Sequence, residues 1–178
     1  VQAGRGDQPA LIYDSPVTGS SETFSFAELL HSVARFAGGL RRLGVDAGDR
    51  VVIYMPMVPE AVIAMLACAR LGAIHAVVFG GFGAPELATR IDDVEPRVIV
   101  SASCGIEPQR VVEYKPLLEQ AIALAASKPQ RCVILQRPQA QAALQPGRDL
   151  DWNEVLDDAE PVDPVPVPAE APLYVLHT

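Results

Sequence analysis

The sequence of 178 residues predicts an α/β fold, in which helices cover both faces of a mostly parallel sheet. Two observations support this fold class. Short apolar runs alternate with helical patterns along almost the whole chain, and no internal repeat is visible. The composition, with 49% apolar and 20% charged residues, is that of a globular protein long enough to bury a real core.

The first predicted helix follows a short apolar run over residues 10–13. Ser25, with Glu28 three residues later, fits a capping box. The apolar positions after this cap recur at helical spacing until Gly44, which stands where a C′ glycine is favoured. Three arginines lie off the apolar stripe and are expected to be solvated: Arg35, Arg41 and Arg42.

The second helix is expected from Pro59 to Leu71, after a β-rich run over residues 51–55. Proline is favoured as a first helical residue, and Glu60 suits the positive end of the helix dipole. The helix is apolar nearly all round, so we expect it to be buried between layers. Three nearby methionines are interpreted as core filling: Met55, Met57 and Met65.

The remaining elements continue the alternation. A strand over 74–78 leads into the glycine-rich turn 79–83, and a helix follows with Pro85 in its first turn. Residues 138–147, rich in Gln and Ala, are interpreted as a long connection. The other expected elements are strands over 98–101, 132–135 and 173–177, and helices over 115–126 and 151–159.

The prolines of residues 161–172 predict an extended, semi-rigid spacer and not a packed element. We therefore divide the chain into an α/β part, residues 1–160, and a spacer with a final strand, residues 161–178. No helix follows that strand, although a buried parallel strand needs cover on both faces. We expect the chain to be an interrupted part of a larger domain, and its uncovered apolar surface to favour self-association.

Charge and hydropathy exclude several classes of protein. The net charge of −8 argues against a general nucleic-acid binder, because phosphate backbones are held by basic surfaces. The most apolar stretch, residues 61–69, is far shorter than the roughly 20 residues of a membrane helix, so no membrane partner is expected. The chain shows no signal peptide, and it begins at Val1 and not at Met.

The cysteines and histidines show no spacing typical of a metal site. The three cysteines, an odd number, indicate free thiols in a reducing compartment, and neither a zinc site nor a disulfide framework is supported. We expect a cytoplasmic protein, or one of the mitochondrial matrix if the source is eukaryotic. His31 and His75 are interpreted as surface or packing residues.

A glycine cluster, Gly80-Gly81-Phe82-Gly83, lies between a predicted strand and a predicted helix. In an open parallel sheet, ligands bind beyond the carboxyl ends of the strands, where glycines let backbone N–H groups reach a phosphate. The alternative, which the residues by themselves favour, is a tight turn that needs positive φ. A dinucleotide fingerprint would require glycine at Glu86 and an acid after the next strand, so the nicotinamide interpretation fails.

A second polar segment, residues 101–110, also follows a strand and is expected as a loop on the same edge of the sheet. The planar guanidinium of Arg110 matches phosphate oxygens, although a lone loop arginine is more often a solvated charge. Cys104 has no base near it in the sequence, so it is interpreted as a structural thiol.

These blocks together resemble a known family. The runs 50–61, 65–73 and 77–82 are similar to the short-chain acyl-CoA synthetases of the adenylate-forming superfamily, and the resemblance covers the chain from Leu11 onward. The Cys-Gly-Ile-Glu-Pro segment before Arg110 is closer to the propionyl-CoA synthetase branch than to the acetyl-CoA synthetase branch.

The resemblance implies a two-step ligase reaction. ATP, accompanied by Mg, and a short-chain carboxylate would form an acyl-adenylate and pyrophosphate, and the CoA thiol would then displace AMP. The resemblance implies that Phe79, Gly80 and Gly81 lie by the CoA adenine. The implied contacts to the CoA nucleotide and its phosphate come from Glu107, Pro108, Gln109 and Arg110. Acetyl-type relatives place a second arginine where this chain has Glu107, which leaves Arg110 as the cationic contact.

Residues 173–178 resemble the strand that enters the family's ATP-binding loop, with Thr178 as the first residue of that loop. No catalytic residue is assigned to this chain, which we expect to be inactive alone. The acyl chain stays undetermined, because the residues that would line its pocket are not in the sequence. A non-catalytic α/β nucleotide-binding module is the alternative function, since both loops suit an adenine nucleotide without chemistry.

Overall fold

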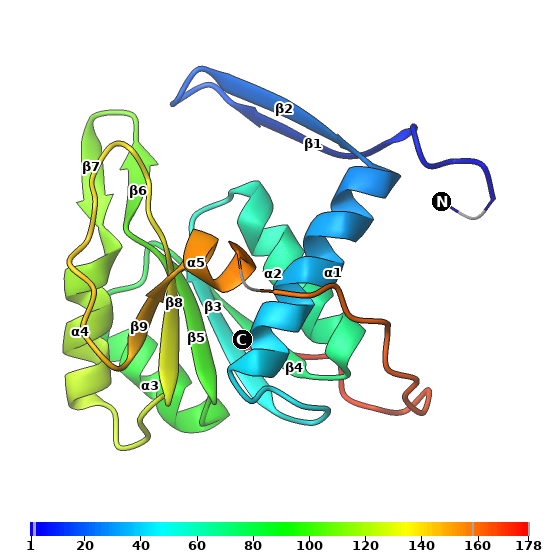
Figure 1. Ribbon diagram of the computed structural model, residues 1–178. Helices are drawn as coiled ribbons and strands as arrows, with labels where there is room; N and C mark the ends of the chain where they lie inside the picture. The colour runs from blue at the N-terminus through cyan, green and yellow to red at the C-terminus, as the bar shows by residue number, and fades with distance from the viewer. Residues whose placement is uncertain (2, 158, 178) are drawn as a thin grey trace.

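A six-stranded parallel sheet forms the centre of the protein, with strand order β10-β4-β3-β5-β8-β9 (Figure 1). The computed structural model describes residue 1, residues 3–157 and residues 159–177. The predicted α/β fold class is confirmed. The strands of this sheet are β3 (Arg50–Met55), β4 (Ile74–Phe79), β5 (Val98–Ala102), β8 (Arg131–Leu135), β9 (Asp149–Asp151) and β10 (Tyr174–Val175).

Helices cover both faces because side chains alternate along the central strands. Val51 and Ile53 of β3 point into one core layer, and Val52 and Tyr54 point into the other. All four are completely buried. The first layer lies under α1 (Phe26–Arg42), α2 (Pro59–Leu71) and α5 (Trp152–Asp157), and the second under α3 (Ala84–Val94) and α4 (Tyr114–Leu124). Each fully buried Ile or Val contributes about 1.5–3 kcal/mol relative to exposure.

The predicted ends of α1 are confirmed. The Glu28 backbone N–H donates to Ser25 Oγ at 3.2 Å, and the Ser25 N–H donates to Glu28 Oε2 at 2.8 Å. Gly44 has φ of +83° just beyond the helix. The expectation for Arg35 was wrong: it is half-buried, and its guanidinium donates to the Leu156 carbonyl of α5.

The methionine interpretation holds for two of the three residues. Met55 is buried at the end of β3, and Met65 packs against the same core layer. Met57 is 85% exposed, so its assignment to the core was wrong. The chain has left the sheet by this residue and has not yet entered α2, so neither layer covers the Met57 side chain.

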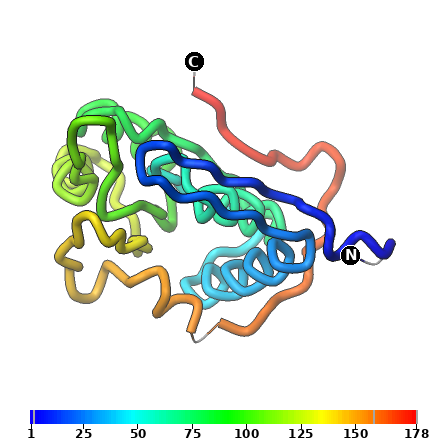
Figure 2. The backbone as a smooth tube through the Cα atoms, turned by 90° about the horizontal axis from the view of Figure 1, so that it is seen from above, coloured from blue at the N-terminus to red at the C-terminus, as the bar shows by residue number. Residues whose placement is uncertain are grey.

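The proline-rich segment packs on the helices, contrary to the expectation of an unpacked spacer (Figure 2). The Val162 N–H donates to the Ala34 carbonyl of α1 at 3.2 Å, and the Val165 N–H donates to the Arg70 carbonyl of α2 at 2.8 Å. A Cβ on Gly38 would lie 1.9 Å from the Glu160 carbonyl oxygen, so glycine is required for this approach. The division of the chain at residue 160 stays a prediction.

Two antiparallel hairpins stand apart from the central sheet (Figure 1). The first pairs β1 (Pro9–Ser15) with β2 (Ser20–Ser25) and crosses above α1 and α2. The second pairs β6 (Cys104–Glu107) with β7 (Arg110–Glu113). Neither hairpin was predicted, although the apolar run over residues 10–13 lies within β1; β9 was missed as well, and the last strand is shorter, at two residues, than expected.

One face of β4 is open. Val77 is 48% exposed and Phe79 is 70% exposed, although both lie in a sheet strand. Among the residues that the structure describes, the core layer under α1, α2 and α5 includes no residue of β4. This exposed apolar face agrees with the predicted uncovered surface, whereas self-association stays a prediction. Within the described ranges, no helix is long and apolar enough to span a membrane.

Candidate functional site

The turn after β4 presents two aromatic rings at the carboxyl edge of the sheet. Phe79 ends β4 and is 70% exposed. Its ring meets the Phe82 ring edge-on, with centroids 5.9 Å apart. The Phe82 N–H donates to the Phe79 carbonyl at 3.0 Å, which closes the turn. An exposed aromatic ring beside a glycine pair is a surface on which a planar base can stack.

The glycines of this turn serve close packing and not an unusual backbone conformation. Gly80 and Gly81 are not among the glycines with positive φ, so that part of the tight-turn interpretation was wrong. A Cβ on Gly80 would lie 2.2 Å from the Tyr114 hydroxyl, and one on Gly81 would lie 2.4 Å from the Phe79 ring. Glycine is needed at Gly80 because the buried Tyr114 side chain fills the space, whereas the Phe79 ring beside Gly81 is exposed and can shift.

The second predicted segment forms a hairpin and not a loop. Glu107 lies opposite Arg110 in the register of β6 and β7, and Pro108 and Gln109 make the two-residue connection. Proline suits the first central position of a type I or type II turn. The hairpin was not predicted because its connection, Pro108-Gln109, lacks the Asn-Gly or Asp-Gly signal of two-residue turns.

The hairpin tip carries an ion pair. Arg110 Nε lies 2.7 Å from Glu107 Oε2, and both side chains are exposed. The hydrogen bond from Arg110 lowers the pKa of the Glu107 carboxyl, and the same bond raises the pKa of Arg110. Arg110 is therefore not a free cation: a phosphate must compete with Glu107 for the guanidinium.

The structure brings the glycine turn and the base of the hairpin together at Tyr114. The parallel strands β4 and β5 both end at the same edge of the sheet, with β3 between them. The Tyr114 hydroxyl is the nearest atom both to a Cβ built on Gly80 and to one built on Gly105, at 2.2 and 2.6 Å. The expectation that both segments share one edge is confirmed.

Arg137 is a second cation near the hairpin that the sequence analysis did not single out. It follows β8 and is half-buried, with its guanidinium donating to the Cys104 carbonyl at 3.2 Å. Its backbone N–H donates to Ser103 Oγ at 2.8 Å. No motif marks this residue, since its position depends on contacts with a segment more than thirty residues away.

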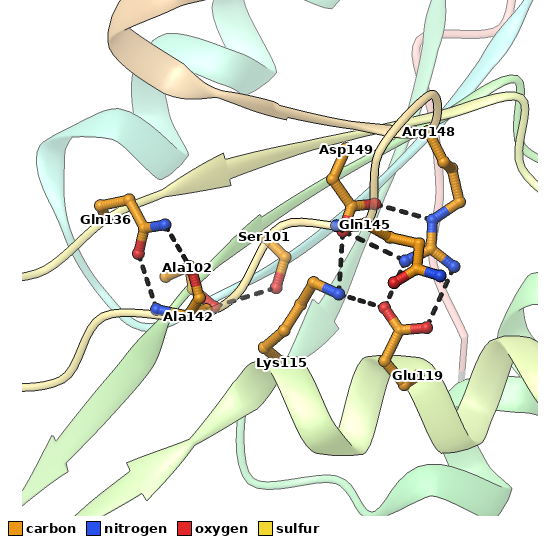
Figure 3. Close-up of polar contacts among 9 residues, drawn as sticks. All are labelled: Ser101, Ala102, Lys115, Glu119, Gln136, Ala142, Gln145, Arg148 and Asp149. Atoms are coloured by element: carbon orange, nitrogen blue, oxygen red, sulfur yellow. Dashed lines mark hydrogen bonds and ion pairs between the residues drawn. The ribbon is translucent and has the colours of Figure 1, made fainter.

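A partly buried charge network lies between α4 and β9 (Figure 3), with the side chains of Lys115 and Asp149 buried and that of Glu119 40% exposed. Lys115 Nζ lies 2.8 Å from Asp149 Oδ2 and also pairs with Glu119. Arg148 pairs with the same two carboxylates, with Nε 2.7 Å from Asp149 Oδ1. A cavity of about 390 Å³ adjoins the network and is lined by Ser103, Glu113, Lys115, Pro116, Glu119 and residues 141–143 and 145.

The network keeps its carboxylates ionised. Burial raises the pKa of Asp149, but hydrogen bonds from Arg148 and Lys115 outweigh burial and lower the net pKa below the ordinary 3.8. For Glu119, burial is likewise outweighed by Arg148 and Lys115, and the pKa lies below 4.5. With every charge paired, the cluster is suited to joining α4 to β9 and not to proton transfer.

The three cysteines are free and buried: Cys68, Cys104 and Cys132. Burial raises the pKa of the Cys68 and Cys132 thiols to about 12, so neither is a nucleophile at neutral pH. His75 is buried in β4, and His31 is exposed on α1. In the described ranges, no group of three or more potential ligands is arranged to hold a metal ion. Thr178, the predicted first residue of an ATP loop, lies outside the described residues.

Comparisons with known proteins give a consistent result. Residues 1–178 match the family model described as AMP-binding enzyme. The chain is 54% identical, over 179 aligned residues, to the mitochondrial acyl-CoA synthetase short-chain family member 3 of Rattus norvegicus, covering all of this chain and 26% of the relative. It is 39% identical to the acetyl-coenzyme A synthetase of Pasteurella multocida, covering 98% of this chain and 27% of the relative.

A solved structure supports the same relationship. The acetoacetyl-CoA synthetase from Streptomyces lividans aligns with a TM-score of 0.87 and 29% identity, over 99% of this chain and 26% of that one. The chain thus spans roughly a quarter of the length of these relatives. Because the family model matches the chain from end to end, the chain belongs to the AMP-binding enzyme family, and its relatives there include short-chain acyl-CoA synthetases.

Proposed function

We propose that the full-length protein containing this chain is an AMP-forming ligase that joins a short-chain carboxylate, acetate or propionate, to CoA. The similarity to relatives named as short-chain acyl-CoA and acetyl-CoA synthetases supports this class of reaction. The observation that carries the part assigned to this chain is the meeting of the glycine turn and the hairpin base at Tyr114. The turn 79–82 and the hairpin 104–113, which the resemblance links to CoA, are thereby neighbours at one edge of the sheet.

The proposed reaction has two displacements. A carboxylate oxygen attacks the α-phosphorus of ATP. The bond from that phosphorus to the bridging oxygen breaks, and pyrophosphate leaves with the electron pair. The CoA sulfur then attacks the acyl carbonyl carbon, the C–O bond to AMP breaks, and the thiol proton is lost to solvent. No residue of this chain is assigned a catalytic role. Mg accompanies the phosphates of ATP, which are proposed to bind from Thr178 onward.

Each predicted CoA contact has a chemical role in this proposal. The exposed Phe79 ring offers a stacking surface for adenine, and the Gly80-Gly81 backbone lies beside it without a side chain in the way. Arg110 offers a guanidinium to a phosphate. Glu107 holds that guanidinium until an anion replaces it, and Pro108 and Gln109 set the geometry of the tip.

The first experiment measures pyrophosphate release from ATP by the full-length protein with acetate, propionate or butyrate. Carboxylate-dependent release would establish the ligase function, and the preferred acid would identify the branch. Residues 1–178 by themselves are expected to release none; turnover by this chain alone would contradict that part of the proposal. If a folded full-length protein released no pyrophosphate with any acid, the ligase function would be wrong and a nucleotide-binding module would be the better description.

The CoA assignment is tested by Arg110→Ala in the full-length protein. We expect the KM for CoA to rise about three- to tenfold, because one charge-assisted contact is lost, while carboxylate-dependent pyrophosphate release without CoA is retained. Arg41→Ala, on the exposed end of α1, is the matched control and should change neither quantity. Equal losses in both half-reactions would show damaged folding and not a CoA contact.

We also propose a cytoplasmic location, or the mitochondrial matrix in a eukaryote. The reduced, buried cysteines support a reducing compartment, and the rat relative is named as mitochondrial. Self-association of the 178-residue chain through the open face of β4 is a further proposal, supported by the exposure of Val77 and Phe79. Sedimentation of the isolated chain would test it.

A further inference from the structure

Two stacked tyrosines lie under the candidate site, one from the sheet and one from the helix α4 that packs on it. Tyr54 comes from β3 and is completely buried, and Tyr114 begins α4 and is 6% exposed. Their ring centroids are 5.0 Å apart, with an angle of 28° between the ring planes. Burial raises the pKa of Tyr54 to about 12 and also raises the pKa of Tyr114, so both hydroxyls remain protonated at neutral pH.

Tyr54 is bonded to the glycine turn. Its hydroxyl donates to the Phe82 carbonyl oxygen at 2.8 Å, and the Phe82 N–H closes the turn on Phe79. The acceptor is a backbone atom of an irregular segment, so this bond fixes the position of the segment and not only that of one side chain. A buried hydroxyl that lost this partner would remain unsatisfied.

Tyr114 separates the turn from the hairpin. Its side-chain tip is the nearest group to the Cβ positions of Gly80 on one segment and Gly105 on the other. The backbone N–H of Tyr114 donates to the Ser103 carbonyl at 3.0 Å, which ties the start of α4 to the start of the hairpin. Since neither glycine has positive φ, their shared feature is close approach to this one aromatic side chain.

We propose that Tyr54 and Tyr114 are positioning residues, which set the separation between the turn 79–82 and the hairpin 104–113 and thereby the geometry of the CoA site. Neither needs to touch the ligand. The inference rests on the proposed function, because the consequence of a changed separation is read through CoA. A displacement of even about 1 Å between two binding elements is enough to change rates and affinities severalfold or more.

The test uses the full-length protein and two readouts: the KM for CoA in thioester formation, and carboxylate-dependent pyrophosphate release without CoA. Tyr54→Phe keeps the stacked ring but loses the bond to Phe82, and should raise the CoA KM about three- to tenfold. Tyr114→Leu removes the ring and should raise it about tenfold to a hundredfold. Tyr114→Phe loses the hydroxyl but keeps the ring atoms that approach both glycines, so it should raise the CoA KM less than Tyr114→Leu does.

A double substitution makes the test specific to spacing. Gly80→Ala places a methyl group where the Tyr114 hydroxyl lies and should raise the CoA KM. In Gly80→Ala/Tyr114→Leu the methyl group has room, so the double variant should bind CoA better than Gly80→Ala alone, a non-additive result. Tyr13→Phe, which changes a half-buried tyrosine of β1, is the matched control and should leave both readouts unchanged.

The outcomes separate this inference from the proposed function. If the folded parent protein formed no thioester with CoA, the proposed ligase function would be wrong. A parent protein that uses CoA, with Tyr54→Phe and Tyr114→Leu unchanged in CoA KM, would overturn the positioning role alone. Parallel losses of pyrophosphate release and CoA use would also overturn it, since they indicate general damage to the fold. Additive effects of Gly80→Ala and Tyr114→Leu would exclude the proposed spacing mechanism.

Discussion

Two arginine–carboxylate pairs in this protein have the same chemistry and opposite surroundings. Arg110 and Glu107 meet at the exposed tip of the β6–β7 hairpin, with side chains 70% and 48% accessible. Arg148 and Asp149 meet behind the same hairpin, where the Asp149 side chain is completely inaccessible (Figure 3). Water and salt can replace either partner at the tip, whereas in the interior each charge depends on the other.

The difference indicates separate roles. The interior pair belongs to a network in which Lys115 and Arg148 share the carboxylates of Glu119 and Asp149, and the backbone N–H of Gln145 also donates to Asp149 at 2.8 Å. It fixes the long connection before β9 against α4. The pair at the hairpin tip joins no second element to the hairpin, and its charges remain accessible to a ligand.

The largest effect is expected from Asp149→Ala. Removal of this carboxylate leaves the buried Lys115 with Glu119 as its remaining partner, so the loss of stability should approach, and not exceed, the roughly 3–5 kcal/mol of an uncompensated buried charge. Hydrogen exchange of the backbone amides of α4 and β9 in the full-length protein measures the loss locally. Glu107→Ala at the hairpin tip is the matched control and should leave those amides as protected as before. Equal amide exchange in Asp149→Ala and Glu107→Ala would contradict the proposed difference between the interior pair and the exposed pair.

A smaller loss is expected when the pair is replaced and not broken. In Lys115→Met/Asp149→Leu both charges are gone and apolar groups fill the space, so stability should recover most of what Asp149→Ala loses. Arg148 still pairs with Glu119 in this double variant. The unfolding midpoint in urea is the measurement. A double variant no more stable than Asp149→Ala would show that the network is needed for more than charge compensation.

Acid should abolish the difference in the free energy of unfolding between the parent protein and Asp149→Asn. The folded-state pKa of Asp149 lies below its ordinary 3.8, so its contribution is fully present above pH 3.8 and is lost as the pH falls through the lower folded value. Glu119 behaves in the same way below its ordinary 4.5. Urea unfolding between pH 7 and pH 2 gives the free energy of unfolding of each protein against pH. The two curves should be separated near neutrality and converge in acid. A gap that widens in acid would reverse the assigned sign.

The smallest effect is expected at the hairpin tip. Glu107→Gln removes the carboxylate that holds Arg110, and should lower the KM for CoA by about two- to fivefold without changing the unfolding midpoint. The change is opposite in sign to that of Arg110→Ala, and high salt should reduce it because exposed charges are screened. An unchanged KM in Glu107→Gln would show that the two residues do not compete as proposed.

Local patterns predicted most of the backbone. The capping box at Ser25, the proline at the start of α2 and the alternation of strands with helices were sufficient for the fold class and for most of the element boundaries. They failed at both hairpins, since β2 and the strands of 104–113 were not predicted, and at the three-residue strand β9. They also failed at Met57 and Arg35, because exposure depends on which neighbouring elements cover a side chain.

The candidate site was predicted only in part. Phe79, Gly80, Gly81 and residues 107–110 were assigned to CoA through the family resemblance, which stays a prediction, and the topology of a parallel sheet was enough to place both segments at one edge. The partner of Arg110 was not anticipated, since the pairing follows from the register of a hairpin. Arg137 was missed for a similar reason: its contacts come from a segment distant in sequence.

By itself, the sequence of this protein determined the alternating elements and the resemblance to acyl-CoA synthetases, because these depend on neighbouring residues and on motifs. Only the tertiary structure decided that Tyr114 lies between Gly80 and Gly105, and that Lys115 and Arg148 share two carboxylates. The physical reason is distance along the chain. Gly80 and Tyr114, like Lys115 and Asp149, are more than 30 positions apart, and contacts of this kind are set by the packing of whole elements, which no local pattern encodes.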